Sequence, residues 1–200
     1  MLRPLLLFCL LVAATCVVAD TNNEVTQIGH DRFEADFPSG GVLKMRVRPS
    51  ALHVIGSEDN KIRVHYRGKG SDQADNVKVI LKTSGNQGEL NISGGPRNDF
   101  EIEVEVPRNL DLYLRVAAGD VEISKLVGNK DIEVHAGDVT IGIGDPDEYA
   151  QVDASVNAGD IDADPFGEAK SGLFRSFKRF GSGRYRLHAH VGAGDLTFRR

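Results

Sequence analysis

The stretch Ile132–Ile141, with the sequence IEVHAGDVTI, decides the fold of this chain because it recurs at three other places. All the copies align without gaps, and each has Ala-Gly-Asp at its centre. In every copy a valine precedes this centre and an aliphatic residue follows that valine five positions later, as Val134 and Val139 do here. The second half of the chain is therefore an internal repeat, and its other copies are Leu114–Ile123, Ala154–Ala163 and Ala189–Phe198.

The Ala-Gly-Asp centre of each copy predicts a corner in the backbone. Inward-facing residues of one continuous strand are an even number of positions apart, so an odd spacing requires a bend. Glycine supplies a backbone conformation that other residues avoid. Strands that are joined by such corners and stacked on one another form a β-solenoid, in which each turn covers the apolar face of the next. The predicted structural residues of the corners are Gly119, Asp120, Gly137, Asp138, Gly159, Asp160, Gly194 and Asp195.

Apolar and polar residues also alternate upstream of the repeats, for example at Leu43, Met45 and Val47. Period-two alternation predicts strands with one buried face. We therefore expect an all-β protein, a short single-stranded β-solenoid, in which residues 40–106 form irregular first turns or a β-cap. The expected domain covers residues 40–200, with clear repeats at 110–200, and a lead segment of residues 20–39 precedes it.

The first nineteen residues have the pattern of a secretory signal peptide. Arg3 supplies a positive charge, residues 5–18 are apolar and uncharged, and Ala19 ends a cleavage site of small residues. The apolar run is too short for a retained membrane span. We expect export to the periplasm, the cell surface or the extracellular medium, with no transmembrane span in the mature chain.

Cysteine usage and charge narrow the functional classes. Both cysteines, Cys9 and Cys16, lie within the predicted signal peptide, so we expect no disulfide and no cysteine-held metal in the mature chain. Lipidation of Cys16 is the alternative to cleavage after Ala19. The formal net charge is −5 at pH 7, and removal of Arg3 with the signal peptide makes it more negative. Such an acidic chain argues against nucleic acid as a partner.

An ordered set of motifs resembles a known bacterial family. Leu52–Gly56, with the sequence LHVIG, is followed by Ile62–Val64 (IRV), then by Val106–Leu110 (VPRNL), and then by the Gly-Asp-Val steps of the repeats. Over residues 40–200 this series is similar to the putative-adhesin family catalogued as domain of unknown function 4097. The resemblance implies a right-handed, β-helix-like solenoid in the bacterial envelope and an adhesin-like role, with no established catalytic residues.

The four corner aspartates have two interpretations. If the turns stack in register, their carboxylates lie about one strand spacing apart, roughly 4.8 Å, and two bare charges at that distance repel by about 0.9 kcal/mol in water. Backbone N–H groups that donate to each carboxylate would offset this repulsion, as is common for Asp in turns. The alternative is a bound calcium ion, although each corner offers only one carboxylate. We favour the hydrogen-bonded column.

Two histidines, His188 and His190, are a weaker candidate for a metal site. They alternate with apolar residues and share the outward face of their strand. Imidazoles two residues apart, with carboxylates on adjacent strands, could hold zinc or copper, and a solvated ladder of mixed charge is the alternative. The neighbours that the repeat alignment predicts are Asp131 and Asp153 for His188, and Glu133 and Arg115 for His190.

The longest interval between corners contains an insertion, residues 167–185, that interleaves basic and apolar residues. Its phenylalanines recur at three- and four-residue steps, which predicts a short amphipathic helix. Its charges predict a contact with anionic lipid head groups or acidic polysaccharide of the envelope. The alternative is that the phenylalanines cap the core. The candidate contact residues are Lys170, Arg175, Phe177, Lys178 and Arg179.

Catalytic motifs are missing from the sequence. It contains no Gly-x-Ser-x-Gly elbow, no phosphate-cradling loop and no His-Glu-x-x-His motif. We therefore expect an exported, non-catalytic binding or scaffold module of the cell envelope, without a cofactor and with an unidentified ligand. The alternatives are a calcium-stabilised surface protein and a polysaccharide-active β-helix enzyme, for which the candidate groups are Asp131, Asp153, Glu133 and Arg115.

Overall fold

The computed structural model describes residues 22–28, 32–48, 51–68, 76–95, 100–170 and 172–200. The predicted signal peptide, with Cys9 and Cys16, lies outside these residues. Two nine-stranded mixed sheets contain most of the described chain, which confirms the all-β prediction. The helices whose residues are all described are the single 3₁₀ turns η2 (Pro146–Glu148) and η3 (Asp164–Phe166). In the part of the chain that the structure describes, no helix has the length and apolarity needed to cross a membrane.

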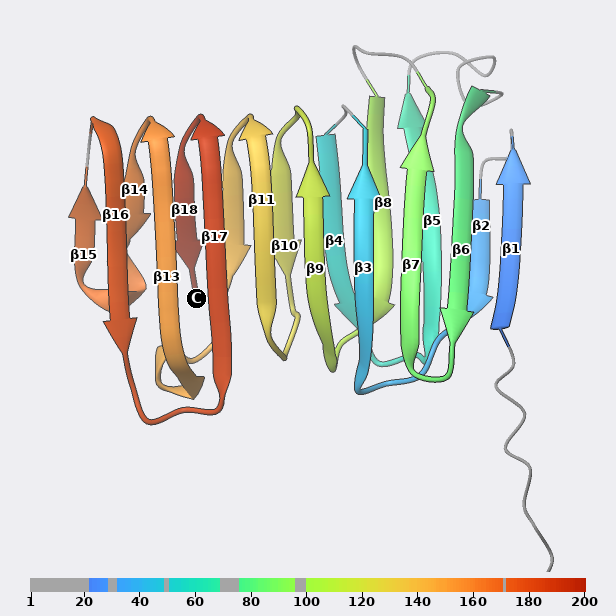
Figure 1. The fold of residues 1–200 in the computed structure, drawn as a ribbon, viewed down its shortest axis with the longest axis horizontal. Helices are drawn as coiled ribbons and strands as arrows, with labels where there is room; N and C mark the ends of the chain where they lie inside the picture. Colours follow the sequence, from blue (N-terminus) through green and yellow to red (C-terminus); the bar gives the residue numbers. More distant parts are fainter. Residues whose placement is uncertain (1–21, 29–31, 49–50, 69–75, 96–99, 171) are drawn as a thin grey trace, which may run out of the picture.

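The two sheets form two layers, one behind the other in the view of Figure 1, and the strands of each sheet follow one another along the long axis of the molecule. The strands of sheet A, in spatial order, are β1 (Asn22–Ile28), β6 (Lys78–Ser84), β7 (Gln87–Ser93), β3 (Gly41–Val47), β9 (Leu110–Val116), β11 (Lys130–Ala136), β17 (Tyr185–Ala193), β13 (Tyr149–Ala158) and β16 (Leu173–Phe180). The strands of sheet B, from the same end, are β2 (Arg32–Asp36), β5 (Lys61–Gly68), β8 (Phe100–Pro107), β4 (Ala51–Ser57), β10 (Val121–Ser124), β12 (Val139–Gly142), β18 (Leu196–Arg199), β14 (Ile161–Ala163) and β15 (Glu168–Lys170).

Each copy of the repeat places one strand in sheet A and the next strand in sheet B. The pairs are β9–β10, β11–β12, β13–β14 and β17–β18, and neighbouring pairs run parallel. Their register matches the sequence alignment, because Val134 lies opposite both Val116 and Val191. The pair β3–β4 stacks on β9–β10 in the same way. Both sheets are open, with edges at β1 and β16 in sheet A and at β2 and β15 in sheet B.

The spatial order of the pairs differs from their order in the chain. The last pair, β17–β18, lies between β11–β12 and β13–β14 (Figure 1). The insertion explains this order, because β15 and β16 pair antiparallel with the far edges of β14 and β13. Those edges are therefore occupied, and the returning chain pairs with the other edges of β13 and β14.

The corner glycines adopt a backbone conformation that L residues rarely reach. Gly137 and Gly194 both have φ of 131°, and Gly119 and Gly159 have φ of 125° and 139°. The corners also stack closely, so that a Cβ built on Gly137 would lie 2.2 Å from the carbonyl oxygen of Gly119. The corner thus requires glycine both for its dihedral angles and for the space between neighbouring turns.

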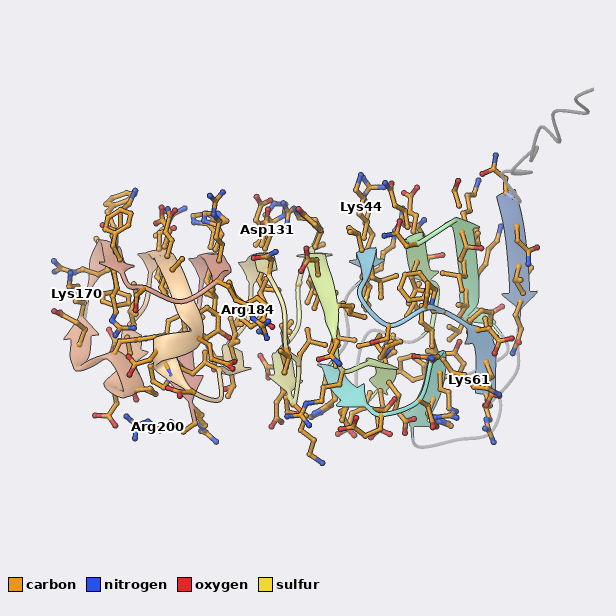
Figure 2. The ribbon with its side chains drawn as sticks, turned by 90° about the horizontal axis from the view of Figure 1, so that it is seen from below. Lys44, Lys61, Asp131, Lys170, Arg184 and Arg200 are labelled. Atoms are coloured by element: carbon orange, nitrogen blue, oxygen red, sulfur yellow. The ribbon has the colours of Figure 1, made fainter. Side chains whose placement is uncertain are left out.

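The core lies between the sheets and consists of the alternating apolar residues. Leu43, Met45 and Val47 are at most 3% exposed, as the sequence pattern predicts. One repeat copy has alanines, Ala154 and Ala163, at inward positions. This copy forms β13 and β14, the strands with which the insertion pairs. Polar side chains point away from both layers, and Figure 2 shows Lys44 and Asp131 on the same outer face.

The expected lead segment, residues 20–39, contributes strands to the sheets. Its strands β1 and β2 form the outermost positions at one end, antiparallel to β6 and β5. In residues 40–106, consecutive strands such as β3 and β4 lie in different sheets, as in the repeats, and each is parallel to the strand beside it. Strands β5 and β6, in contrast, are antiparallel to their neighbours. This end of the stack therefore finishes in antiparallel edge strands, as the other end does.

Candidate functional site

The corner aspartates form a hydrogen-bonded column in the spatial order of the pairs. Oδ1 of Asp120 accepts the backbone N–H of Asp138 at 3.1 Å. Oδ1 of Asp138 accepts the N–H of Asp195 at 2.9 Å, and Oδ1 of Asp195 accepts that of Asp160 at 2.8 Å. Oδ1 of Asp160 accepts the N–H of Gly172, in the insertion, at 3.2 Å. Every carboxylate of the column therefore has a backbone donor, and calcium at this column stays a prediction.

A second ladder of polar side chains runs along sheet A and was not anticipated from the sequence. Asn129 donates its backbone N–H to Asp111 Oδ1 at 2.8 Å and its side-chain amide to Asp111 Oδ2 at 2.9 Å. The Asn129 Oδ1 atom accepts the backbone N–H of Arg186 at 2.8 Å. The repeat alignment begins after these positions, so the sequence offered no periodic signal for this ladder.

The outer face of sheet A brings together the histidines and carboxylates that the repeat alignment placed side by side. His188 on β17 lies opposite Asp131 on β11 and opposite Asp153 on β13. His190 lies opposite Glu133 and, on its other side, Ser155. Arg115, which we expected beside His190, is one strand further away on β9, opposite Glu133.

Arg115 neutralises part of the negative charge on this face. Its Nη1 lies 3.0 Å from Asp131 Oδ1, and its Nε lies 3.0 Å from a Glu133 carboxylate oxygen. The Nη1 group donates its hydrogen bonds to the carbonyl oxygens of Leu114 and Asp131, each at 3.0 Å. Asp131 Oδ1 is buried and accepts no hydrogen bond, so its contact with the guanidinium is electrostatic only.

The neighbouring groups leave His188 accessible. Asp153 is paired with Lys178 of β16 at 3.0 Å, and His190 Nδ1 shares a hydrogen bond with Ser155 Oγ at 2.8 Å. His188 itself is exposed and has no hydrogen-bonding partner in the described part of the chain. It lines a surface depression of about 550 Å³ together with Tyr113, Asn129, Asp131, Asp153 and Arg186.

The insertion is extended, so the prediction of an amphipathic helix is wrong. Residues Glu168–Lys170 form β15 and Leu173–Phe180 form β16, the edge strands at one end of both sheets. In a strand, alternate residues face inward, and only Phe177 enters the core, where it packs 5.7 Å from the Phe166 ring. The three- and four-residue spacing of the phenylalanines therefore does not mark one apolar face.

The candidate contact residues of the insertion fall into two groups. Phe177 is 4% exposed and cannot touch a partner, and Arg179 is held against Asp147, Pro146 and the Phe166 ring. Arg175, Lys178 and Lys170 reach solvent, although Lys178 pairs with Asp153 and Lys170 donates to the Ser176 carbonyl oxygen at 2.9 Å. The exposed apolar residues of this strand are Leu173, Phe174 and Phe180, at 65%, 80% and 75% exposure. We call this set of exposed residues, with Arg175 and Lys178, the β16 edge patch.

At the other end, sheet B carries a surface charge network. Glu34 accepts hydrogen bonds from Arg32, Lys61 and Arg63, and these donors, led by Lys61, lower the Glu34 pKa to about 2. Arg63 also pairs with Asp59 at 2.7 Å and with Glu105 at 3.0 Å. Figure 2 shows Lys61 at the opposite end of the molecule from Lys170. All these cations have carboxylate partners, so the network cross-links β2, β5 and β8.

One lysine is buried, which the sequence did not reveal. Lys130, at the start of β11, is 2% exposed and donates to Tyr149 Oη at 2.9 Å and to the Gly128 carbonyl oxygen at 3.2 Å. Tyr149 in turn donates to the Ile143 carbonyl oxygen at 3.2 Å. Burial lowers the Lys130 pKa to about 8 and raises that of Tyr149. This lysine occupies an inward position, where the alternation predicts an apolar residue.

Comparison with known proteins finds likeness in solved structures alone. No family model and no curated protein matches the chain, so the resemblance to the adhesin family stays a prediction. A putative cell adhesion protein from Clostridium sporogenes is similar with a TM-score of 0.52 and 12% identity, over 89% of this chain and 99% of that chain. A putative adhesin from Bacteroides fragilis aligns with a TM-score of 0.33 and 10% identity, over 90% and 99%. At 12% identity, the similarity to the Clostridium sporogenes protein shows a likeness in fold.

Proposed function

We propose that this chain is an exported, non-catalytic, adhesin-like module of the cell envelope, built as a short β-solenoid. Each repeat copy consists of two strands joined at a glycine corner, and the strands of neighbouring copies run parallel. This arrangement supports the solenoid description. The likeness to a putative cell adhesion protein supports the functional class, and the first nineteen residues support export.

The β16 edge patch carries the proposal. Phe174 and Phe180 project from the outer face of an edge strand, and Lys178 lies between them on the same face. Exposed aromatic rings beside basic groups suit an anionic lipid surface, because the rings enter the head-group region while the cations attract the phosphates. We therefore assign anionic phospholipid as the envelope component that this edge contacts.

The test is co-sedimentation of the purified protein with vesicles of phosphatidylglycerol and phosphatidylcholine, at low and high salt. We expect pelleting with the mixed vesicles that decreases at high salt, and none with phosphatidylcholine alone. The double variants Phe174→Ser/Phe180→Ser and Arg175→Ala/Lys178→Ala should each lose this pelleting. None of these four side chains is buried, so the variants should keep the fold.

The matched control is Lys44→Ala/Lys82→Ala, which removes two exposed lysines from the other half of sheet A. It should pellet like the unmodified protein. Equal loss in this control would mean that total charge, and not the β16 edge patch, drives the contact. Pelleting with an insoluble acidic polysaccharide, without any with vesicles, would overturn the assignment to lipid.

A further inference from the structure

Four metal-binding groups form a square on the outer face of sheet A. Asp131 and Glu133 are two residues apart on β11, and His188 and His190 are two residues apart on the adjacent parallel strand β17. The register places Asp131 opposite His188 and Glu133 opposite His190. Ligand atoms of Asp131, Glu133 and His188 all lie within 4.8 Å of one another. Two paired strands of the sheet thus position three ligands on one face.

Two observations separate this square from an ordinary surface ladder. Asp131 Oδ1 lies 3.0 Å from Arg115 Nη1 without accepting a hydrogen bond, and Oδ2 has no partner in the described chain, so this carboxylate keeps an unused acceptor. The His188 imidazole is exposed and has no partner in the described chain. An acceptor and an imidazole, both without a hydrogen bond and opposite each other on neighbouring strands, are the groups that a metal ion would join.

We propose that Asp131, Glu133 and His188 bind a divalent transition metal, with zinc as the ion that fits this donor set. One imidazole nitrogen and two carboxylate oxygens are ligands that zinc takes at about 2.0–2.2 Å, and water would complete a four-coordinate site. Ligand atoms in such a tetrahedron lie roughly 3.4 Å apart, so atoms within 4.8 Å of one another must approach by at most about 1.4 Å. Calcium is disfavoured because it takes oxygen ligands.

The ion pair with Arg115 is compatible with this site. The guanidinium lies beside one oxygen of each carboxylate and is anchored by the backbone carbonyls of Leu114 and Asp131. Each carboxylate keeps a second oxygen, and contacts from outside the ligand set commonly orient ligating carboxylates. Arg115 therefore acts as a positioning residue, and it keeps the carboxylate pair from repelling before an ion arrives.

Zinc bound here would join β11 to β17. These strands adjoin in the sheet although the whole insertion and the pair β13–β14 separate them in the chain. An ion that binds only the folded arrangement stabilises it by an amount that rises with the logarithm of its concentration over its dissociation constant. The expected consequence is a melting temperature that rises when zinc is added.

The experiment is calorimetric titration of the purified protein, made without a polyhistidine tag, with zinc chloride and separately with calcium chloride. We expect one equivalent of zinc to bind and calcium not to bind at this site. His188→Ala and Asp131→Asn should each weaken zinc binding at least about tenfold. Both variants should remain folded by circular dichroism, since His188 is exposed and Asn preserves the shape of Asp131.

The matched control is His53→Ala. His53 lies on sheet B with its Nδ1 3.3 Å from a carboxylate oxygen of Glu122, so it is also a histidine beside an acid but outside the proposed site. This variant should bind zinc as the unmodified protein does. The proposal is overturned if zinc does not bind or if His53→Ala and His188→Ala lose equal affinity for zinc. It is also overturned if calcium binds with the same affinity as zinc and His188→Ala does not weaken calcium binding.

Discussion

The glycine of each Ala-Gly-Asp corner meets two separate constraints. Its φ lies in a region that L residues avoid, and its missing side chain leaves room for the carbonyl oxygen of the neighbouring corner. An aspartate follows each glycine and accepts a backbone hydrogen bond, from the next corner in three cases, as Asp138 does from Asp195, and from Gly172 of the insertion in the case of Asp160. The three-residue motif thus bends the chain and also connects neighbouring corners.

Substitution at Gly137 tests these constraints. Gly137→Ala should lower the free energy of unfolding by at least about 3 kcal/mol, because the added Cβ would lie 2.2 Å from the Gly119 carbonyl oxygen. The matched change is Gly144→Ala, where φ is 67° and no atom lies within 4 Å of the added Cβ. This change should cost about 1 kcal/mol. Urea unfolding of both variants is the measurement, and equal losses would contradict the close approach of the corners.

Lys130 makes stability depend on pH in a defined window. Its pKa is about 8 in the folded protein and 10.5 in an ordinary environment, so the unfolded chain holds more protons between these values. Stability must then rise with pH from about 8 towards 10.5. Lys130→Met, which removes the buried ammonium group, should abolish this rise.

The measurement is urea unfolding of both proteins between pH 7 and 9.5. The free energy of unfolding of Lys130→Met, relative to that of the unmodified protein, should be highest at pH 7 and should fall by about 2 kcal/mol by pH 9.5. The window ends below the ordinary pKa of tyrosine, so Tyr149 does not contribute. Parallel pH profiles for the two proteins would show that Lys130 is not desolvated.

At the scale of elements, β16 shows that the free edge of a neighbouring strand can outweigh a helix-like spacing of apolar residues. Its phenylalanines recur as they would on one face of a short helix, yet β13 presents an unpaired edge to which an extended segment can bond. Edge pairing satisfies the backbone groups of β13 along its length, while a helix would leave them to water. Phe177 then enters the space above Ala154, its partner in the register, and Phe174 and Phe180 point to solvent.

Substituting the two kinds of phenylalanine separates their roles. Phe177→Ala should reduce the free energy of unfolding by about 3 kcal/mol, because it empties part of the aromatic cluster with Phe166. Phe174→Ala should change it by less than about 0.5 kcal/mol, since this side chain is 80% exposed. Chemical denaturation measures both. A helix in the insertion, with all its phenylalanines on one buried face, would make the two losses similar.

At the scale of the whole molecule, the stack has antiparallel strands at both ends. β1 and β2 close one end, and β15 and β16 close the other (Figure 1). Terminal units of stacked-strand proteins are commonly atypical because they must cover the last apolar face. The functional candidates differ in position accordingly, with the β16 edge patch at one end and the proposed metal site on the outer face of the central strands.

Export concerns the whole chain and can be measured directly. When the chain is produced with its first nineteen residues in a bacterial host, we expect a processed product that begins at Asp20, because Ala19 ends the predicted cleavage site. Intact-mass spectrometry of the periplasmic and extracellular fractions identifies it. Ala19→Arg should retain the unprocessed form. A product that begins at a lipid-modified Cys16 would show that the lipidation alternative is right.

The sequence alone determined the features that repeat. Period-two alternation predicted the strands and their buried faces, and the odd spacing around Ala-Gly-Asp predicted the corners. The gapless alignment of the copies predicted the register, so it placed Asp131 and Asp153 beside His188. These features depend on interactions between equivalent positions of adjacent turns, and a sequence repeat records them.

Only the tertiary structure decided the features that occur once. The position of β17–β18 between earlier pairs, the extended form of the insertion and the burial of Lys130 against Tyr149 have no repeated counterpart. Each depends on which edge or space remains unoccupied after the other strands have packed. Because a local pattern does not record that choice, the spacing of residues 173–180 favoured a helix, while the free edge of β13 selected a strand.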